Sequence, residues 1–288
     1  MRRQIIRVEP LSTYLEWYQW RHWCQVSLPP SSDVAPAAPV APTSDRCDEP
    51  RAKNAAWHRR VGTMTPAYRD LARREPVFAR LITGYGRPDP FEWHDGGRTG
   101  SSQFAAMLLH IVGQQISAVA AFAIYDRITA ATGGIPTPAG VLGLGQRRLR
   151  ACGLSAARAG YALALAEAQT TGAIDIEHLD VLGDSDAIAA LTAVRGIGTW
   201  SAETFLIHNL HRPDVLPAGD LGIRRAVQAQ WHLDKLPSPR EVRSRASAWA
   251  PWRSYAAAML WRSLRPPGEA SDPKQRALIK LGEAGRPG

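Results

Sequence analysis

The stretch Leu191–Arg225 reads LTAVRGIGTWSAETFLIHNLHRPDVLPAGDLGIRR, and it decides how the rest of the chain is interpreted. Two glycines, Gly196 and Gly198, interrupt a pattern of apolar residues at helical spacing, which predicts a helix, a tight turn and a second helix. Glycine tolerates a positive φ and lets another backbone approach closely. We expect the amides of Ile197, Gly198 and Thr199 to point outward at the start of the second helix, where free N–H groups and the helix dipole favour a phosphate oxygen.

A single acid follows this turn. Asp220 lies 22 residues after Gly198, directly after a loop over 215–219 that contains a proline and ends in Gly219. A Gly-X-Gly turn without other signals is usually a connector, and an Asp before a helix is usually an N-cap. In this chain the two features occur together, 22 residues apart.

The combination resembles the helix-hairpin-helix, Gly/Pro-rich loop and Asp signature of base-excision DNA glycosylases, and most of all the 3-methyladenine DNA glycosylase II family. Three further stretches agree with that family in order: Gly113–Ser117 (GQQIS), Gly153–Ala159 (GLSAARA) and Trp249–Ala256 (WAPWRSYA). The resemblance covers residues 64–288. It implies an all-α fold of two helical subdomains flanking an active-site cleft, built from 64–100 with 200–288 and from 101–199.

The resemblance also implies roles for individual side chains. Asp220 would be the catalytic carboxylate that stabilises the oxocarbenium-like sugar formed as the C1′–N bond breaks. Trp200 and Trp261 would line the base pocket, where an indole over a cationic purine contributes about 0.5–2 kcal/mol. Thr204 stands where the family's bacterial archetype has an aromatic residue, which leaves the range of lesions open.

DNA contacts are implied in the same way. Gln115 matches the residue that fills the gap left by the extruded nucleotide. The other expected DNA-binding positions are Gln114, Ser117, Gly196, Ile197, Gly198, Thr199 and Arg253. Arg158 could contact a phosphate, but we expect it to be solvated. A monovalent cation is expected at the hairpin carbonyls of Thr192, Val194 and Ile197; no other metal and no cofactor is expected.

The segment also bears on strand cleavage. Relatives that cut the strand use a lysine amine two residues past the second hairpin glycine, which forms a Schiff base with the sugar. Trp200 occupies that position here, and residues 191–230 contain no lysine. We therefore expect a monofunctional enzyme that removes alkylated purines by hydrolysis and leaves an abasic site.

Two other functions stay open. One is a glycosylase for a different lesion, uracil or an oxidised purine. The other is a non-catalytic helix-hairpin-helix DNA-binding protein. Asp220 and the paired tryptophans argue against the second, because DNA binding requires neither.

Composition agrees with a nucleic-acid partner. The 288 residues carry a formal net charge of +9, with a pI near 9.9, which suits double-stranded DNA. The three cysteines, Cys24, Cys47 and Cys152, are too few for a four-cysteine iron–sulfur cluster and fit a reducing compartment. No membrane span or secretory signal is evident, so we expect a cytoplasmic monomer, associated with the nucleoid if the source is bacterial.

The rest of the chain divides by composition. Residues 1–63 hold a Trp/Tyr cluster and a Pro/Ala/Ser-rich run over 27–50, and we expect this extension to be largely disordered. Residues 64–265 form the glycosylase domain, and 266–288 a mobile tail. Sequence signals predict a helix starting at Pro76, a capping box at Ser238–Glu241 and a last helix over 254–264. Further helices are expected over 104–112, 117–131, 138–143, 146–151, after Ser155, from Asp184 and after Asp220.

Overall fold

The computed structural model describes residues 66–270 and 272–282, and every regular element within these ranges is helical. The predicted all-α class is therefore confirmed. All site residues discussed below lie in one compact unit, which begins at Ala67. The predictions for the extension over 1–63 fall outside the described residues. Across the described ranges, no helix is both long enough and apolar enough to cross a bilayer.

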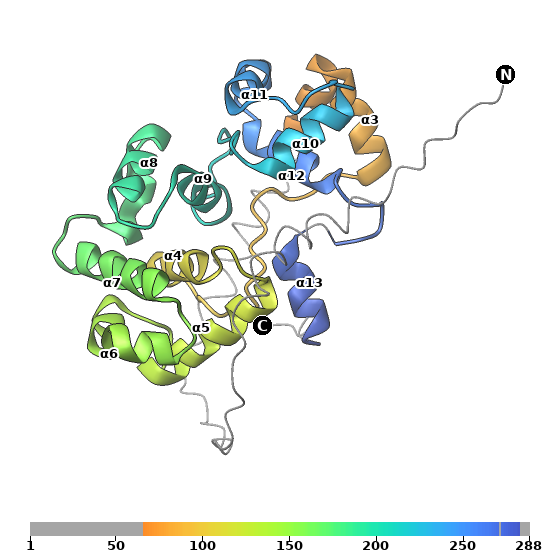
Figure 1. The fold of residues 1–288 in the computed structure, drawn as a ribbon. Helices are drawn as coiled ribbons and strands as arrows, with labels where there is room; N and C mark the ends of the chain where they lie inside the picture. The colour runs from red at the N-terminus through yellow and green to blue at the C-terminus, as the bar shows by residue number, and fades with distance from the viewer. Residues whose placement is uncertain (1–65, 271, 283–288) are drawn as a thin grey trace, which may run out of the picture. The chain divides into compact units, whose positions relative to one another are not determined.

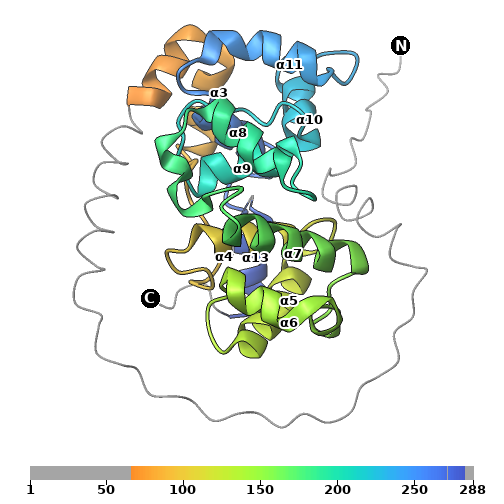
Figure 2. The same cartoon turned by 90° about the vertical axis from the view of Figure 1, so that its left-hand side faces the viewer.

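A first set of helices packs around one central helix, α4, in which eight of the ten residues are buried. Helix α4 contacts α5, α7, α9 and η1, while α6 joins α5 to α7, and α8 packs on α9 (Figures 1 and 2). The set comprises α4 (Gln103–Val112), α5 (Ala118–Thr132), α6 (Pro138–Ala151), α7 (Ala156–Thr170), η1 (Ile176–Val181), α8 (Asp184–Ala193) and α9 (Thr199–His208).

A second set is organised around α12, which packs against α3 and α10. Trp249, in the short helix η2, is buried and lies edge-on to Phe78 at 5.3 Å between ring centroids and parallel to Trp231 at 5.6 Å. The set comprises a helix over 66–74, α3 (Pro76–Tyr85), α10 (Leu221–Gln230), α11 (Pro239–Ala246), η2 (Ser247–Trp249) and α12 (Arg253–Arg262).

The helix starts predicted from capping residues are confirmed. Ser155 accepts a hydrogen bond from the Arg158 amide at the start of α7. Ser238 and Glu241 form both bonds of a capping box, with Pro239 in the first turn of α11. Two short helices were expected over 138–143 and 146–151, and both lie within α6. Gly145, with φ 64°, interrupts the helical geometry between them.

The division between the two sets differs from the expectation. We expected residues 200–288 to join 64–100 in one subdomain, but α9 packs against α8 and α4, which belong to the first set. Residues 201–207 of α9 are all buried, so this helix is enclosed on every side rather than lying at an edge.

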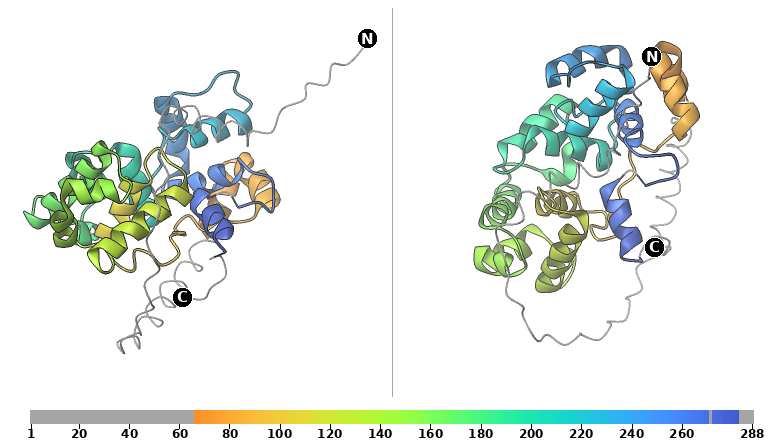
Figure 3. Two further views of the ribbon diagram at one scale, coloured as in Figure 1. Left: turned by 60° about the horizontal axis from the view of Figure 1, so that its bottom comes forward. Right: turned by 45° about the vertical axis from the view of Figure 1, so that its right-hand side comes forward.

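The C-terminal segment contains a helix that the sequence prediction missed. Residues 266–288 were expected to be a mobile tail, yet α13 (Pro273–Lys280) begins at an Asp272 N-cap and packs against α5. Figure 3 shows this helix, in dark blue, beside the yellow-green α5. Asp272 followed by Pro273 is the signal that could have revealed it.

Candidate active site

The turn between α8 and α9 is tightly packed at its first glycine. Gly196 has φ 95°, a conformation that side-chain-bearing residues rarely adopt. A Cβ at this position would lie 2.1 Å from Cγ of Tyr161. The side-chain amide of Gln114 donates, through Nε2, to the backbone carbonyl of Gly196 at 2.9 Å. Gln114 therefore ties the junction between α4 and α5 to the hairpin.

The hairpin amides are not all free. The Ile197 amide donates to the Val194 carbonyl at 3.1 Å, so the expectation that it points outward is wrong. Gly198 is the N-cap of α9 and Thr199 its first residue, and helix N-termini leave their first amides without an intrahelical acceptor. A Cβ on Gly198 would meet no heavy atom within 4 Å. The amides of the turn that lack an intrahelical acceptor are thus those at the start of α9.

The loop that leads to Asp220 is held by α12. The Ser254 hydroxyl accepts from the Val215 amide at 3.0 Å and donates to the Arg212 carbonyl at 2.6 Å. Arg253 binds both oxygens of Asp214, each at 2.7 Å. Arg253 was expected to contact DNA, but its guanidinium group anchors this loop. Its pKa is raised by the hydrogen bond to Asp214.

The carboxylate of Asp220 is fixed by three donors. Asp220 is the N-cap of α10, and its Oδ1 accepts from the Ile223 amide at 2.8 Å. The same oxygen accepts from Nε1 of Trp261 at 3.1 Å, and Oδ2 accepts from Nε1 of Trp200 at 2.8 Å. The structure therefore brings together the acid and both tryptophans that the sequence singled out, from α9, α10 and α12.

Gly222 gives these groups the room to meet. A Cβ on Gly222 would lie 2.9 Å from Oδ1 of Asp220 and 3.1 Å from Cδ1 of Leu264. It would also approach Cδ1 of Trp261 to 3.6 Å. A methyl group at this position would displace the Asp220 carboxylate and crowd the side chain of Leu264, while its contact with the Trp261 ring would be an ordinary one. The sequence analysis did not identify this glycine.

The third expected pocket residue plays a different part. Thr204 is buried, and its hydroxyl donates to the backbone carbonyls of Trp200 at 2.9 Å and Ser201 at 3.1 Å. Trp200 is 47% exposed, whereas Trp261 is half-buried. Trp200 is thus the accessible member of the pair.

The remaining predicted DNA contacts lie around the start of α5. Gln115 is exposed and has φ 56°, which is uncommon for a residue with a side chain. Ser117 accepts from the Ala120 amide as the N-cap of α5. Arg158 was expected to be solvated, but it is half-buried and donates to the Val112 carbonyl at 2.9 Å.

A second acid near Asp220 was missed by the sequence analysis. Glu203, on α9, is only 8% exposed. Burial raises the pKa of its carboxyl to about 7; Arg243 lowers it and the negative charge of Asp220 raises it further. Glu203 lies three positions after Trp200, among residues 201–207, which are all buried. A charged residue in such a run is the signal that could have identified it.

Replacing Glu203 with Gln is expected to change how stability depends on pH. Between about 4.3, the usual pKa of Glu, and the folded value, the folded protein retains a proton that the unfolded chain has released. Stability therefore falls as the pH rises through this window, by at most about 1.4 kcal/mol per pH unit. The free energy of unfolding is measured in urea at pH 5 and pH 8 for both proteins. From pH 5 to pH 8, Glu203→Gln should become more stable relative to wild type by about 1–3 kcal/mol. An equal difference at both pH values would contradict this assignment.

A group of rings behind Trp261 was also missed. The His208 ring lies parallel to that of Trp261, with 6.0 Å between centroids and 22° between planes. The ring centroids of Trp93 and His208 are 6.1 Å apart, and Nζ of Lys274 lies 3.8 Å from the centroid of the Trp93 ring. Burial, then the charge of Lys274, lowers the pKa of His208 to about 4, so the imidazole is neutral at physiological pH. The residues are too far apart in sequence for local patterns to connect them.

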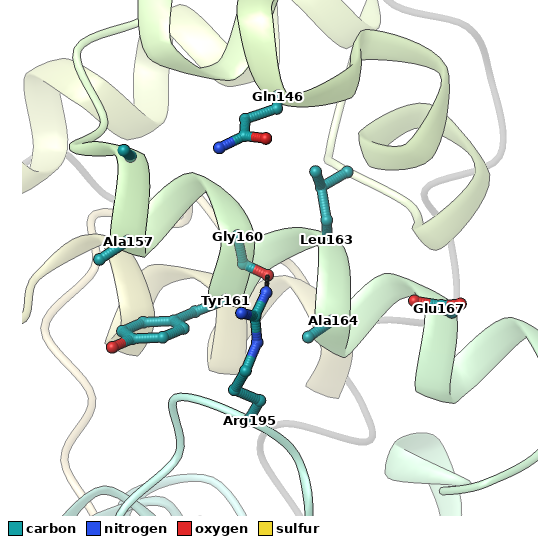
Figure 4. Close-up of a pocket in the computed structure, with 9 residues that line it drawn as sticks. Gln146, Ala157, Gly160, Tyr161, Leu163, Ala164, Glu167 and Arg195 are labelled. Atoms are coloured by element: carbon teal, nitrogen blue, oxygen red, sulfur yellow. Dashed lines mark hydrogen bonds between the residues drawn. The ribbon is translucent and has the colours of Figure 1, made fainter.

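A surface hollow of about 680 Å³ lies beside the hairpin rather than at Asp220. It is lined mainly by α7 residues, including Tyr161, and Figure 4 shows Gln146 and Arg195 at its margin. The Arg195 guanidinium donates to the Gly160 carbonyl at 3.2 Å. None of the residues predicted to act on DNA lines this hollow.

The chain has clear similarities to known proteins. The profile of the HhH-GPD superfamily base excision DNA repair proteins matches residues 109–251. DNA-3-methyladenine glycosylase 1 of Schizosaccharomyces pombe is 34% identical over 206 residues, which cover 70% of this chain and 89% of that protein. DNA-3-methyladenine glycosylase 2 of Escherichia coli is 29% identical over 127 residues, covering 44% of this chain and 42% of that protein.

The fold is similar as well. A solved structure of S. pombe 3-methyladenine DNA glycosylase in complex with abasic DNA matches with a TM-score of 0.60 and 30% identity, over 69% of this chain and 96% of that one. The hairpin, the loop and the aspartate thus occur in a chain that aligns with the S. pombe glycosylase over 206 residues, most of the described length. The chain belongs to the HhH-GPD superfamily of base excision DNA repair proteins, and its relatives include DNA-3-methyladenine glycosylases.

Proposed function

We propose that this protein is a monofunctional DNA glycosylase that excises alkylated purines of the 3-methyladenine type from double-stranded DNA. The observation that carries the proposal is the Asp220 carboxylate, held by the indole N–H groups of Trp200 and Trp261 after a helix-hairpin-helix turn. The names of the relatives agree with it.

The chemistry follows from the charge that the reaction develops. When the C1′–N bond breaks, positive charge builds up on the sugar, and a carboxylate in a fixed position stabilises it without reorganising. Asp220 supplies that charge, and its three donors keep both oxygens in place. Water attacks C1′, and the product is an abasic site.

The base must leave the duplex stack to reach this carboxylate. The exposed ring of Trp200 and the half-buried ring of Trp261 offer electron-rich faces to a cationic purine. Gln115 is exposed at the junction before α5, and in our proposal its side chain fills the gap in the duplex. Gln114 supports the hairpin through the Gly196 carbonyl.

The hairpin would dock on the phosphate backbone. The amides of Gly198 and Thr199 begin α9, and Thr192 lies in the last turn of α8, where carbonyl oxygens have no intrahelical partner. In our proposal the carbonyls of Thr192, Val194 and Ile197 hold a monovalent cation, which would add positive charge at this point; the Val194 carbonyl also accepts from the Ile197 amide. The net charge of +9 strengthens the attraction to DNA.

Strand cleavage is not part of the proposal. Trp200 has no nucleophilic amine, and its indole N–H is bound to Asp220. Arg195, Arg224 and Arg225 cannot replace a lysine, because arginine stays protonated.

The test is base release from duplexes that each contain one lesion: 3-methyladenine, 7-methylguanine, hypoxanthine, uracil or 8-oxoguanine. We expect excision of the alkylated purines, with strand breaks only after alkali and no adduct trapped by borohydride. Excision of uracil or 8-oxoguanine alone would replace the lesion class, and strand scission without alkali would overturn the monofunctional assignment. Binding without any base release would leave a DNA-binding protein.

A further inference from the structure

A row of rings leads away from the candidate site. Trp261, whose Nε1 donates to Asp220, lies parallel to His208 at 6.0 Å between centroids. His208 lies 6.1 Å from Trp93, with 34° between the ring planes. The outer end of the row is Nζ of Lys274, 3.8 Å from the centroid of the Trp93 ring.

These residues come from segments that are distant in sequence. Trp93 follows α3, His208 ends α9, Trp261 is in α12 and Lys274 is in the first turn of α13. His110 of α4 supports the row, because its ring is stacked on Trp93 at 4.7 Å. Helix α13 thus reaches the row through the side chain of Lys274.

Two nitrogens within the row are buried and have no hydrogen-bond partner among the described residues, namely Nε1 of Trp93 and Nδ1 of His208. No hydrogen bond therefore fixes either of these two atoms within the described chain. The positions of both rings depend on contacts with their faces, and the ammonium group of Lys274 provides one such contact for Trp93.

Two carboxylates near Lys274 counteract the cost of burying its ammonium group. Burial lowers the pKa of Lys274, while the carboxylates of Asp272 and Asp95 act in the opposite direction. Asp272 also caps α13 by accepting from the Lys274 amide at 2.7 Å. The cap and the cation–π contact together hold the first turn of α13 against the rings.

We propose that Lys274 is a positioning residue for the active site, acting through Trp93 and His208 on the ring of Trp261. Closely packed interiors transmit small displacements, because neighbouring side chains leave no free volume to absorb them. Loss of the ammonium lets Trp93 and His208 shift, and Trp261 then turns away from the pose that faces a cationic base and holds Asp220. This inference rests on the proposed glycosylase function.

The experiment measures single-turnover excision, with enzyme in excess, on 7-methylguanine as a cationic lesion and on hypoxanthine as a neutral one. Lys274→Met should slow excision of 7-methylguanine about three- to thirtyfold and that of hypoxanthine less. Lys274→Arg should retain most of the wild-type rate, because guanidinium also stacks on indole. Lys280→Met is the matched control, since Lys280 is an exposed lysine on the same helix, and it should behave as wild type.

A double variant tests whether the effect passes through Trp261. If it does, Lys274→Met should add little to the loss already caused by Trp261→Ala, whereas independent effects would multiply. The unfolding temperature of each variant is measured, and rates are taken well below it. Lys274→Gln serves the same purpose should Lys274→Met not fold.

The possible outcomes distinguish a failure of the role proposed for Lys274 from a failure of the proposed glycosylase function. Wild-type excision combined with a Lys274→Met rate equal to that of Lys280→Met would overturn the inference and leave the proposed function intact. Multiplicative losses in the double variant, or equal losses on both lesions, would also overturn it. Absence of excision by the wild-type protein on every lesion would refute the proposed function itself, and the inference with it.

Discussion

Replacing Asp220 with Asn is expected to reduce single-turnover excision of 7-methylguanine about 10³-fold or more. The charged carboxylate stabilises the developing cation, and a neutral amide of the same shape does not. Asp220 also accepts from donors at both oxygens, Trp261 and Ile223 at Oδ1 and Trp200 at Oδ2. An Asn has one acceptor oxygen, so its NH₂ group would face one of these donors.

The side chain of this variant has a preferred orientation. With its oxygen at the Oδ1 position, Asn keeps the N-cap of α10 and the bond from Trp261, and only Trp200 loses its acceptor. Asn is as good an N-cap as Asp, so the unfolding temperature should change little.

Binding to a duplex that carries a stable abasic analogue should be unchanged or tighter, because a negative charge near the phosphates is removed. Excision is measured with enzyme in excess, so that binding does not limit the rate. A folded Asp220→Asn protein that excised 7-methylguanine at the wild-type rate would exclude Asp220 as the catalytic acid.

The parts of the site that local sequence could indicate were predicted well. A glycine turn, a Pro/Gly loop and an acid at a characteristic spacing carry their own signal, and the resemblance added Trp200 and Trp261. All three side chains meet in the structure. Caps such as Ser155 were found for the same reason, since a cap depends only on its neighbours in sequence.

The parts that depend on distant packing were not predictable in this way. The resemblance placed Arg253 among the DNA-binding positions, but no local pattern indicated that its guanidinium binds Asp214, 39 positions earlier in the chain. Lys274 and Trp93 are in contact across 181 positions, and only the folded chain shows that a tail helix reaches this ring. Periodicity indicates which face of a helix is buried, whereas the identity of the neighbour on that face is a tertiary property.

The two hairpin glycines illustrate the same limit, and one added methyl group is expected to destabilise the protein far more at Gly196 than at Gly198. Gly196→Ala should destabilise the protein by about 2–6 kcal/mol, because it combines backbone strain at a positive φ with a clash against the ring of Tyr161. Gly198→Ala should cost only about 1 kcal/mol, because Ala is a poorer N-cap than Gly but the space around this residue is open.

DNA affinity at fixed salt should separate them again. Helix amides can approach a phosphate most closely where no side chain intervenes, so Gly198→Ala should weaken binding to undamaged duplex while the protein stays folded. If Gly198→Ala bound DNA as tightly as wild type, the start of α9 would not be the docking edge.

The cause of the Gly196→Ala defect can be divided by a second change. Tyr161→Ala removes the atoms that the new Cβ would strike but leaves the unfavourable φ of residue 196 in place. The double variant should therefore be less destabilised than the sum of the two single variants, and the shortfall measures the clash. Full additivity in urea unfolding would mean that strain at the turn, and not contact with Tyr161, is what requires glycine there.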